Sequence, residues 1–110
     1  MDRREKSVVD AFHNLYYDGL KGGEGRIYER TYWMNIPCLK CPLDMWIYQE
    51  IIAEIKPDLI IETGTFLGGS ALFMANMLDL LGKGEVVSID FQEMSPRPSH
   101  SRITYVKGSS

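Results

Sequence analysis

Two periodicities of apolar and polar residues divide the chain into predicted helices and strands. Apolar side chains recur at helical spacing in residues 4–18, 42–56 and 71–81. Three short apolar runs, near residues 59–62, 86–90 and 103–107, predict strands, and the first has the pattern of a strand buried on both faces. A strand, a helix and a second strand in succession predict an α/β fold with a parallel sheet.

Two of the predicted helices precede the sheet. The first is amphipathic and we expect it to end at Gly19; its apolar stripe consists of Val8, Val9, Phe12, Leu15 and Tyr16. The second begins at Pro42, a residue suited to the first turn of a helix. We expect it to cover one face of the sheet through an inward side made of Ile47, Tyr48, Ile51, Ile52 and Ile55.

The stretch from Pro57 to Asp90 organises the rest of the chain. Its first strand ends in a turn, Glu62–Gly69, that contains three glycines, and Ser70 is the expected N-cap of the helix that follows. The second strand ends at Asp90, about 20 positions after these glycines, where a carboxylate accepts hydrogen bonds from ribose hydroxyls. A glycine turn between strand and helix, followed by a strand that ends in an acid, indicates a nucleotide-binding βαβ unit.

The turn also distinguishes between nucleotides. A dinucleotide fingerprint, G-x-G-x-x-G, that starts at Gly64 would need glycine at position 66, where this chain has Phe66. No G-K-[ST] follows the turn, which excludes a P-loop. Glu62 repels phosphate but suits a cationic ligand. These features favour S-adenosylmethionine (SAM), an adenosine derivative with a cationic sulfonium and amino group. NAD(P) stays open as an alternative.

The sequence also resembles a known family. The run Glu62–Leu72, E-T-G-T-F-L-G-G-S-A-L, resembles the first motif of class I SAM-dependent methyltransferases. Together with Pro37–Glu50 and the segment from Arg97 through Ile103 to Ser110, it resembles the cephalosporin hydroxylase family, which includes rhamnosyl O-methyltransferases. The resemblance implies a Rossmann-like three-layer sandwich, truncated here to about three parallel strands with N-terminal helices.

The βαβ pattern and the resemblance together give a set of cofactor-binding residues: Glu62, Gly64, Thr65, Gly68, Gly69, Ser70, Asp90, Phe91, Ser109 and Ser110. Backbone at the glycines would approach the methionine and ribose parts of SAM, Glu62 would meet the amino group, and Asp90 the ribose. By resemblance Ser109 and Ser110 would lie near adenine, while Phe91 either stacks on adenine or packs in the core. The catalytic base is unknown. In the resembled family a divalent metal such as Mg can lower the pKa of the acceptor hydroxyl, and its ligands would lie beyond Ser110.

Composition narrows the remaining classes. The chain has 110 residues, enough for one domain, and a formal net charge of −3 with no basic patch, so nucleic acid is not an expected partner. It has no apolar stretch of membrane-spanning length and no signal core, so we expect no membrane contact and a cytoplasmic location. We expect residues 1–36 to form an N-terminal helix and connector, and residues 37–110 the N-terminal half of a SAM-binding domain. The expected partner is a small-molecule methyl acceptor, and a homo-oligomer stays open.

Several residues that could carry chemistry have simpler explanations. Cys38 and Cys41 have C-x-x-C spacing, but no second pair or nearby histidines complete a zinc site, so we expect them to pack. His13 is expected to be a surface or packing residue, and His100, near the expected site edge, a candidate base or part of a turn. Tyr32–Trp33 is expected to pack the N-terminal segment against the core.

The sequence therefore predicts a SAM-dependent O-methyltransferase that acts on a hydroxyl of a sugar or secondary metabolite and is represented by its cofactor-binding half. Two alternatives stay open. One is an NAD(P)-binding oxidoreductase module, for which Phe66 would have to be glycine. The other is a truncated, non-catalytic module that associates through an exposed sheet edge.

Overall fold

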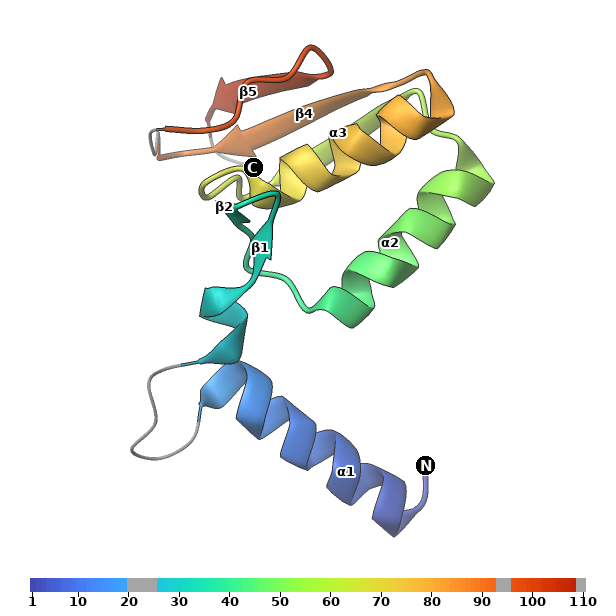
Figure 1. The fold of residues 1–110 in the computed structure, drawn as a ribbon, viewed down its shortest axis with the longest axis vertical. Helices are drawn as coiled ribbons and strands as arrows, with labels where there is room; N and C mark the ends of the chain where they lie inside the picture. Colours follow the sequence, from blue (N-terminus) through green and yellow to red (C-terminus); the bar gives the residue numbers. More distant parts are fainter. Residues whose placement is uncertain (20–25, 93–95, 109–110) are drawn as a thin grey trace.

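The computed structural model describes residues 1–19, 26–92 and 96–108. Its centre is a parallel sheet of three strands, β3 (Leu59–Thr63), β4 (Glu85–Asp90) and β5 (Ile103–Lys107), in the spatial order β3-β4-β5 (Figure 1). In the register of the sheet, Ile61 lies opposite Val87, and Val87 lies opposite Thr104. The three predicted strands and the Rossmann-like arrangement are confirmed.

Helix α3 (Gly69–Leu81) covers one face of this sheet. Successive side chains of a strand point to opposite faces, so Ile60, Val86 and Ile103 share the face beneath which α3 lies. The core between them consists of Ala71, Ala75 and Leu78 from α3, Val86 from β4 and Ile52 from the preceding helix. Leu78 and Val86 are fully buried, which makes this contact the centre of the hydrophobic core.

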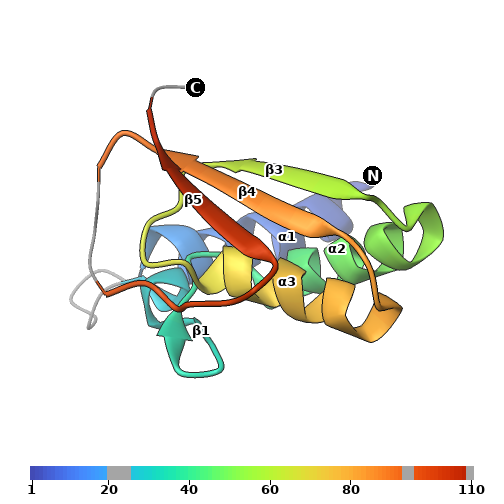
Figure 2. The same ribbon diagram turned by 90° about the horizontal axis from the view of Figure 1, so that it is seen from above.

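The opposite face of the sheet is apolar and exposed. Leu59 and Ile61 of β3 are 51% and 62% exposed, and Val106 of β5 is exposed as well. Figure 2 shows why: the helices of the described residues lie on one side of the sheet. The prediction that the first strand is buried on both faces is therefore wrong, because in the described residues no layer covers the side chains that point away from α3.

Helix α2 (Pro42–Ile55) begins and ends close to the predicted residues but packs differently. Met45 and Ile52 are its buried residues, whereas the other predicted inward residues are exposed: Ile47, Tyr48, Ile51 and Ile55. The helix packs along α3, and an apolar cavity of about 290 Å³ separates it from β3. The prediction that α2 covers the sheet through all five residues is therefore wrong.

Helix α1 (Arg3–His13) projects away from the sheet (Figure 1). Asp2 caps its first turn, accepting from the Glu5 N–H while the Glu5 carboxylate accepts from the Asp2 N–H. The chain continues as a π-helix (Asn14–Asp18) and leaves helical geometry at Gly19, where the predicted end is confirmed. Tyr16 is the buried member of the predicted stripe; Val8 and Phe12 are 64% and 42% exposed.

A small hairpin joins the N-terminal segment to α3, and the sequence did not predict it. After a 3-10 turn (Ile27–Arg30), β1 (Tyr32–Trp33) pairs antiparallel with β2 (Ile36–Pro37) through two residues of positive φ, Met34 and Asn35. Trp33 packs edge-on against Phe73 at 4.9 Å and donates to Asn76 Oδ1. The packing role predicted for Trp33 is confirmed, whereas Tyr32 is 58% exposed.

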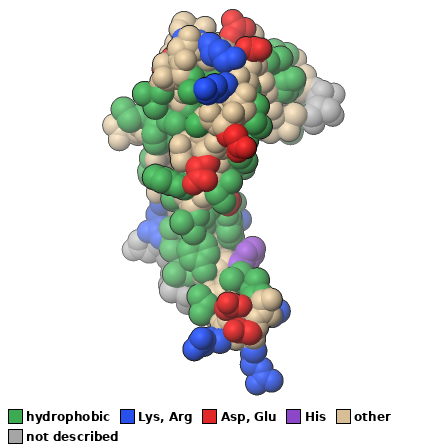
Figure 3. Space-filling view, turned by 90° about the vertical axis from the view of Figure 1, so that its right-hand side faces the viewer, with side chains coloured by type: hydrophobic (Ala, Val, Ile, Leu, Met, Phe, Trp, Pro, Cys, Tyr) green, Lys and Arg blue, Asp and Glu red, His purple; other side chains and the backbone are tan. Residues whose placement is uncertain are grey.

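Hydrophobic side chains also gather on the surface of the molecule. Figure 3 shows them in a band that runs down one side toward the α1 end. Among the described residues, no helix combines the length and the apolar character needed to cross a membrane. The predicted boundary between residues 36 and 37 falls within β2 and stays a prediction.

The contact between the hairpin and α3 depends on Gly69. A Cβ at this position would lie 2.3 Å from the Pro37 carbonyl oxygen and 2.7 Å from Cys38 Cβ. We expect Gly69→Ala to lower the free energy of unfolding by about 1–3 kcal/mol, because backbone atoms must shift to admit the methyl group. Ser70→Ala, one residue later in the same turn, is the matched control and should change it by less than about 0.5 kcal/mol. Urea unfolding measures both; equal effects would contradict this account.

Candidate cofactor site

A cavity of about 280 Å³ opens at the carboxyl ends of β3 and β4, where ligands bind in open α/β sheets. Its lining consists of Thr63, Gly64, Ile89, Asp90, Phe91 and Gly108. Gly64 has φ +87° and nothing within 4 Å of the place where a Cβ would stand, so its backbone is open to a ligand. Its N–H donates to the Ile89 carbonyl (2.8 Å), which ties the start of the turn to the end of β4.

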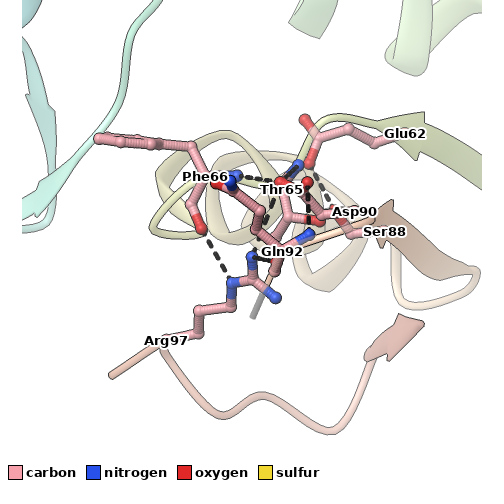
Figure 4. A network of polar contacts seen from close by, with 7 residues as sticks. All are labelled: Glu62, Thr65, Phe66, Ser88, Asp90, Gln92 and Arg97. Carbon is pink, nitrogen blue, oxygen red and sulfur yellow. Dashed lines mark hydrogen bonds and ion pairs between the residues drawn. The ribbon is translucent and has the colours of Figure 1, made fainter. Parts of the chain in front are cut away.

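The carboxylate of Asp90 holds the glycine turn. Asp90 Oδ2 accepts from the N–H groups of Thr65 (3.0 Å) and Phe66 (3.1 Å), and Oδ1 accepts from the N–H of Gln92 (3.2 Å) (Figure 4). Consecutive N–H groups in a turn form an anion-binding nest. In this protein the nest is already filled by the chain's own carboxylate.

Arg97 completes this arrangement from the segment before β5. Its Nε donates to the Phe66 carbonyl (2.8 Å) and its Nη2 to the Gln92 carbonyl (3.0 Å), while Nη2 lies 3.7 Å from Asp90 Oδ2. The hydrogen bonds from Gln92 and Phe66 lower the pKa of Asp90 below its usual value, and the Arg97 charge adds to the effect. Asp90 is therefore held as an anion at neutral pH.

A second chain of hydrogen bonds leads to Glu62. The Ser88 hydroxyl donates to Glu62 Oε1 (2.8 Å), so the Thr65 hydroxyl, 2.7 Å from Ser88 Oγ, is the donor to Ser88. Thr65 and Ser88 are buried at 3% and 0% exposure. These two hydrogen bonds fix the carboxylate of Glu62 relative to the turn (Figure 4).

The structure divides the predicted cofactor residues into two groups. Gly64, Asp90 and Phe91 line one cavity, and Glu62 is linked to it through Ser88 and Thr65. The others have contacts within the protein or lie outside the described residues: Thr65 is buried, Gly68 and Gly69 pack against other segments, Ser70 lies in the first turn of α3, and Ser109 and Ser110 lie outside. Their predicted roles toward a cofactor stay predictions.

The small size of Gly68 serves the segment that carries Arg97. A Cβ on Gly68 would lie 2.8 Å from Pro98 Cδ and 3.1 Å from the Tyr105 hydroxyl. That hydroxyl donates to the Pro98 carbonyl (2.6 Å). Gly68, not Ser70, is the N-cap of α3 and has φ +89°, so the predicted cap at Ser70 is wrong. A left-handed residue is needed here, because the chain turns sharply from β3 into the helix.

Sequence reasoning missed Arg97 and Ser88 as parts of this site. Ser88 lies inside a strand, where alternation predicts only which face it points to. Arg97 lies between prolines in a segment without periodicity. For Arg97 the available signal was its place in a block shared with the resembled family.

His100 does not belong to this edge of the sheet. It precedes β5, and its Nε2 lies 2.7 Å from Asp79 Oδ2 while its Nδ1 accepts from the Arg102 N–H (2.9 Å). Asp79 also accepts from Arg102 Nε (2.8 Å). The prediction that His100 lies near the site edge is wrong, because the turn before a parallel strand lies at the opposite edge from the ends of the neighbouring strands.

The C-x-x-C pair packs, as predicted. Cys38 and Cys41 are buried free cysteines, and Cys38 Sγ lies 4.0 Å from Met45 Sδ. Across the part of the chain that the structure describes, no three His, Cys, Asp or Glu side chains are grouped to hold a metal ion.

Comparisons with known proteins agree with this geometry. The fold is that of a Rossmann-like methyltransferase, here one helical layer on a three-stranded parallel sheet. The family described as "Rhamnosyl O-methyltransferase/CmcI" matches residues 26–110, and the chain belongs to this family. The predicted resemblance is confirmed.

Individual relatives cover nearly the whole chain. It is 36% identical to the rhamnosyl O-methyltransferase of Mycobacterium leprae over 98% of its length, and 35% identical to that of Mycobacterium bovis over 98%. The chain covers 46% and 43% of these proteins, so it spans less than half the length of the curated relatives it matches.

Solved CmcI structures share the fold. One with Mg-SAM and one with SAH each superpose with a TM-score of 0.67 at 22% identity over 84% of this chain, and the chain covers 42% and 50% of them, respectively.

The burial of Cys38 predicts low reactivity. Burial raises the pKa of this thiol to about 11, so its reactive thiolate is scarce in the folded protein. In a Cys41→Ser variant at pH 8, we expect Cys38 to react with a disulfide reagent roughly a hundredfold more slowly when folded than in urea. The Cys38→Ser variant measures Cys41 in the same way. Rapid modification of folded Cys38 would contradict the buried position.

The hydrogen bonds to Asp90 predict a pH dependence of stability. The unfolded carboxyl has a pKa of about 3.9, and the folded pKa is lower. Its contribution to stability is therefore fully present above the unfolded value and is lost as the pH falls through the folded value. We expect the difference in unfolding free energy between wild type and Asp90→Asn to be largest near pH 7 and to shrink toward pH 3. The pKa of Asp79 is also lowered, mainly by its hydrogen bond with His100. Asp79 is present in both proteins, so its contribution cancels in the difference. A difference that stays constant over this range would count against the hydrogen bonds.

Proposed function

We propose that this chain is the cofactor-binding part of a SAM-dependent O-methyltransferase whose acceptor is a small molecule with a sugar or secondary-metabolite hydroxyl. Family membership supports the reaction class, and the names of the curated relatives support a hydroxyl acceptor. The observation that carries the proposal is the occupation of the turn amides by Asp90. A turn filled in this way suits a cofactor without a pyrophosphate.

The same observation argues against a dinucleotide. In NAD-binding βαβ units, the turn and the helix N-terminus receive the pyrophosphate. Here the Thr65 and Phe66 amides already bind a carboxylate, and Glu62 places a second carboxylate beside the turn. A pyrophosphate would have to displace one anion and approach another, which Coulomb repulsion opposes.

The residues around the cavity fit SAM. Asp90 Oδ1 accepts one hydrogen bond and lines the cavity, so it retains capacity for a ribose hydroxyl. Gly64 leaves space for close approach, and the carboxylate of Glu62 suits an amino group. Phe91, 69% exposed at the cavity, offers a ring for adenine.

When bound, SAM supplies a methyl group on an already activated sulfonium. The protein's residues then have to hold the cofactor and orient it, since positioning contributes much of the rate in such displacements. His100 is too remote for the role of base, because it lies with Asp79 at the other edge of the sheet. A role for Mg rests on the family resemblance alone, and we assign none of the described residues to it.

Association with another polypeptide is a second proposal, and it applies equally to a homo-oligomer and to a non-catalytic module. The exposed apolar face around Ile61 and the exposed stripe of α1 support it. The free cysteines Cys38 and Cys41 support a reducing compartment such as the cytoplasm.

Calorimetric titration of the 110-residue chain with SAM, and separately with NAD, tests the proposed function. We expect 1:1 binding of SAM and no binding of NAD at the same concentrations. Asp90→Asn should weaken SAM binding by about tenfold or more, since a charge-assisted hydrogen bond is lost. Asp58→Asn is the matched control. Asp58 precedes β3 at the opposite edge of the sheet, and its 92% exposed carboxylate pairs with Lys83. Tighter binding of NAD, or no binding of SAM, would overturn the proposal.

A further inference from the structure

One residue of the glycine turn is held in a backbone conformation that its side chain disfavours. Phe66 has φ +50°, in the left-handed region where glycine is at ease and a residue with a Cβ is strained. Its neighbours with positive φ, Gly64 and Gly68, are both glycines. A non-glycine residue persists in such a conformation only when its surroundings hold it there.

Both backbone groups of Phe66 are held from outside the turn. Its N–H donates to Asp90 Oδ2 (3.1 Å) and its carbonyl accepts from Arg97 Nε (2.8 Å). Figure 4 shows the ring of Phe66 directed away from this network, so the side chain takes no part in it. Asp90 thus binds the peptide group that precedes the Phe66 Cα, and Arg97 binds the peptide group that follows it.

Arg97 is itself well placed for this task. Its side chain is 11% exposed, its guanidinium lies 5.6 Å from the centre of the Tyr105 ring, and Nη2 also donates to the Gln92 carbonyl. Gly68 lets the Pro98 ring lie against the turn, which brings the Arg97 backbone close. The planar guanidinium satisfies two carbonyls and an anion from one fixed position.

We propose that Arg97 is a positioning residue for the cofactor site, which fixes Phe66 in its left-handed conformation and thereby orients the Asp90 carboxylate at the cavity edge. The inference rests on the proposed function for its ligand, SAM. Arg97 acts through Phe66 and Asp90. Without Arg97, Phe66 can relax toward an unstrained φ, which withdraws its N–H from Asp90 and leaves the carboxylate held by the Thr65 and Gln92 amides.

The test is a set of variants read by SAM titration. We expect Arg97→Met to weaken SAM binding about tenfold to a hundredfold, and Phe66→Gly alone to change it less than about threefold. In the double variant Arg97→Met with Phe66→Gly, affinity should return to within about fivefold of wild type, because glycine adopts the conformation unaided. Arg97→Met with Phe66→Ala should stay weak, since alanine removes the ring but keeps the Cβ.

Arg102→Met is the matched arginine control. Arg102 is also partly buried and paired, with Asp79 and the Gly84 carbonyl, but at the opposite edge of the sheet. It should leave SAM affinity within about threefold of wild type. Rescue by Phe66→Ala as well as by Phe66→Gly, or equal losses from Arg97→Met and Arg102→Met, would refute the positioning role.

Amide hydrogen exchange without ligand separates this inference from the proposed function. We expect the Thr65 and Phe66 amides to exchange at least about tenfold faster in Arg97→Met than in wild type, and no such change in Arg102→Met. If wild type binds no SAM but these amides respond as expected, the proposed function fails and the hold on Phe66 stands. If SAM binds and the amides do not respond, the positioning role is wrong.

Discussion

The structure of the site depends on one interaction: the Asp90 carboxylate accepts hydrogen bonds from the backbone N–H groups of the glycine turn. It joins the end of β4 to the turn after β3, so that the two strand ends and the start of α3 form one rigid corner. Hydrogen bonds to an ionised acceptor are stronger than those between neutral groups. The Asp90 side chain is 12% exposed, so its two hydrogen bonds to the turn are mostly shielded from solvent. The shape of the cavity follows from this corner, since Gly64, Asp90 and Phe91 all belong to it.

Close contacts at two adjacent glycines extend the rigid corner outward. At Gly69 the end of the β1–β2 hairpin lies directly against the start of α3, and at Gly68 the Pro98 ring packs against it. Adjacent glycines therefore admit two different segments to one helix N-terminus. The glycines that pattern recognition assigns to a ligand are also explained by packing, and Gly64 is the member of the set that stands free.

The sequence predicted much of the fold because its signals are local. Hydrophobic periodicity located α2, α3 and the three strands, and the parallel arrangement followed from the strand–helix–strand order. The burial of those elements was predicted less well. Ile61 and Ile55 are exposed because burial depends on what packs above a residue, and an apolar run carries no such information. The hairpin was missed because Met34 and Asn35, the two residues of its turn, are a much weaker turn signal than the Asn-Gly pair typical of such hairpins.

The site was predicted in outline and not in its connections. Spacing located Asp90 at the end of a strand, but spacing cannot tell which donors a carboxylate meets. Phe66 was recognised as the wrong residue for a pyrophosphate, while its positive φ was not, because aromatic residues seldom adopt this conformation. The contact between Arg97 and Asp90 exists only in the folded protein, and the proline-containing sequence between them has no periodicity from which it could be predicted.

The exposed face of the sheet also bears on how the protein folds. Each strand pairs with the next one along the chain, in the order β3-β4-β5, so the sheet and α3 can form from contiguous residues as they are synthesised. The unit formed in this way presents Leu59, Ile61 and Val106 to solvent. Transiently exposed apolar surface is what chaperones recognise and what causes aggregation during folding. The side chains on the uncovered face of the sheet therefore also make the newly formed unit prone to aggregation.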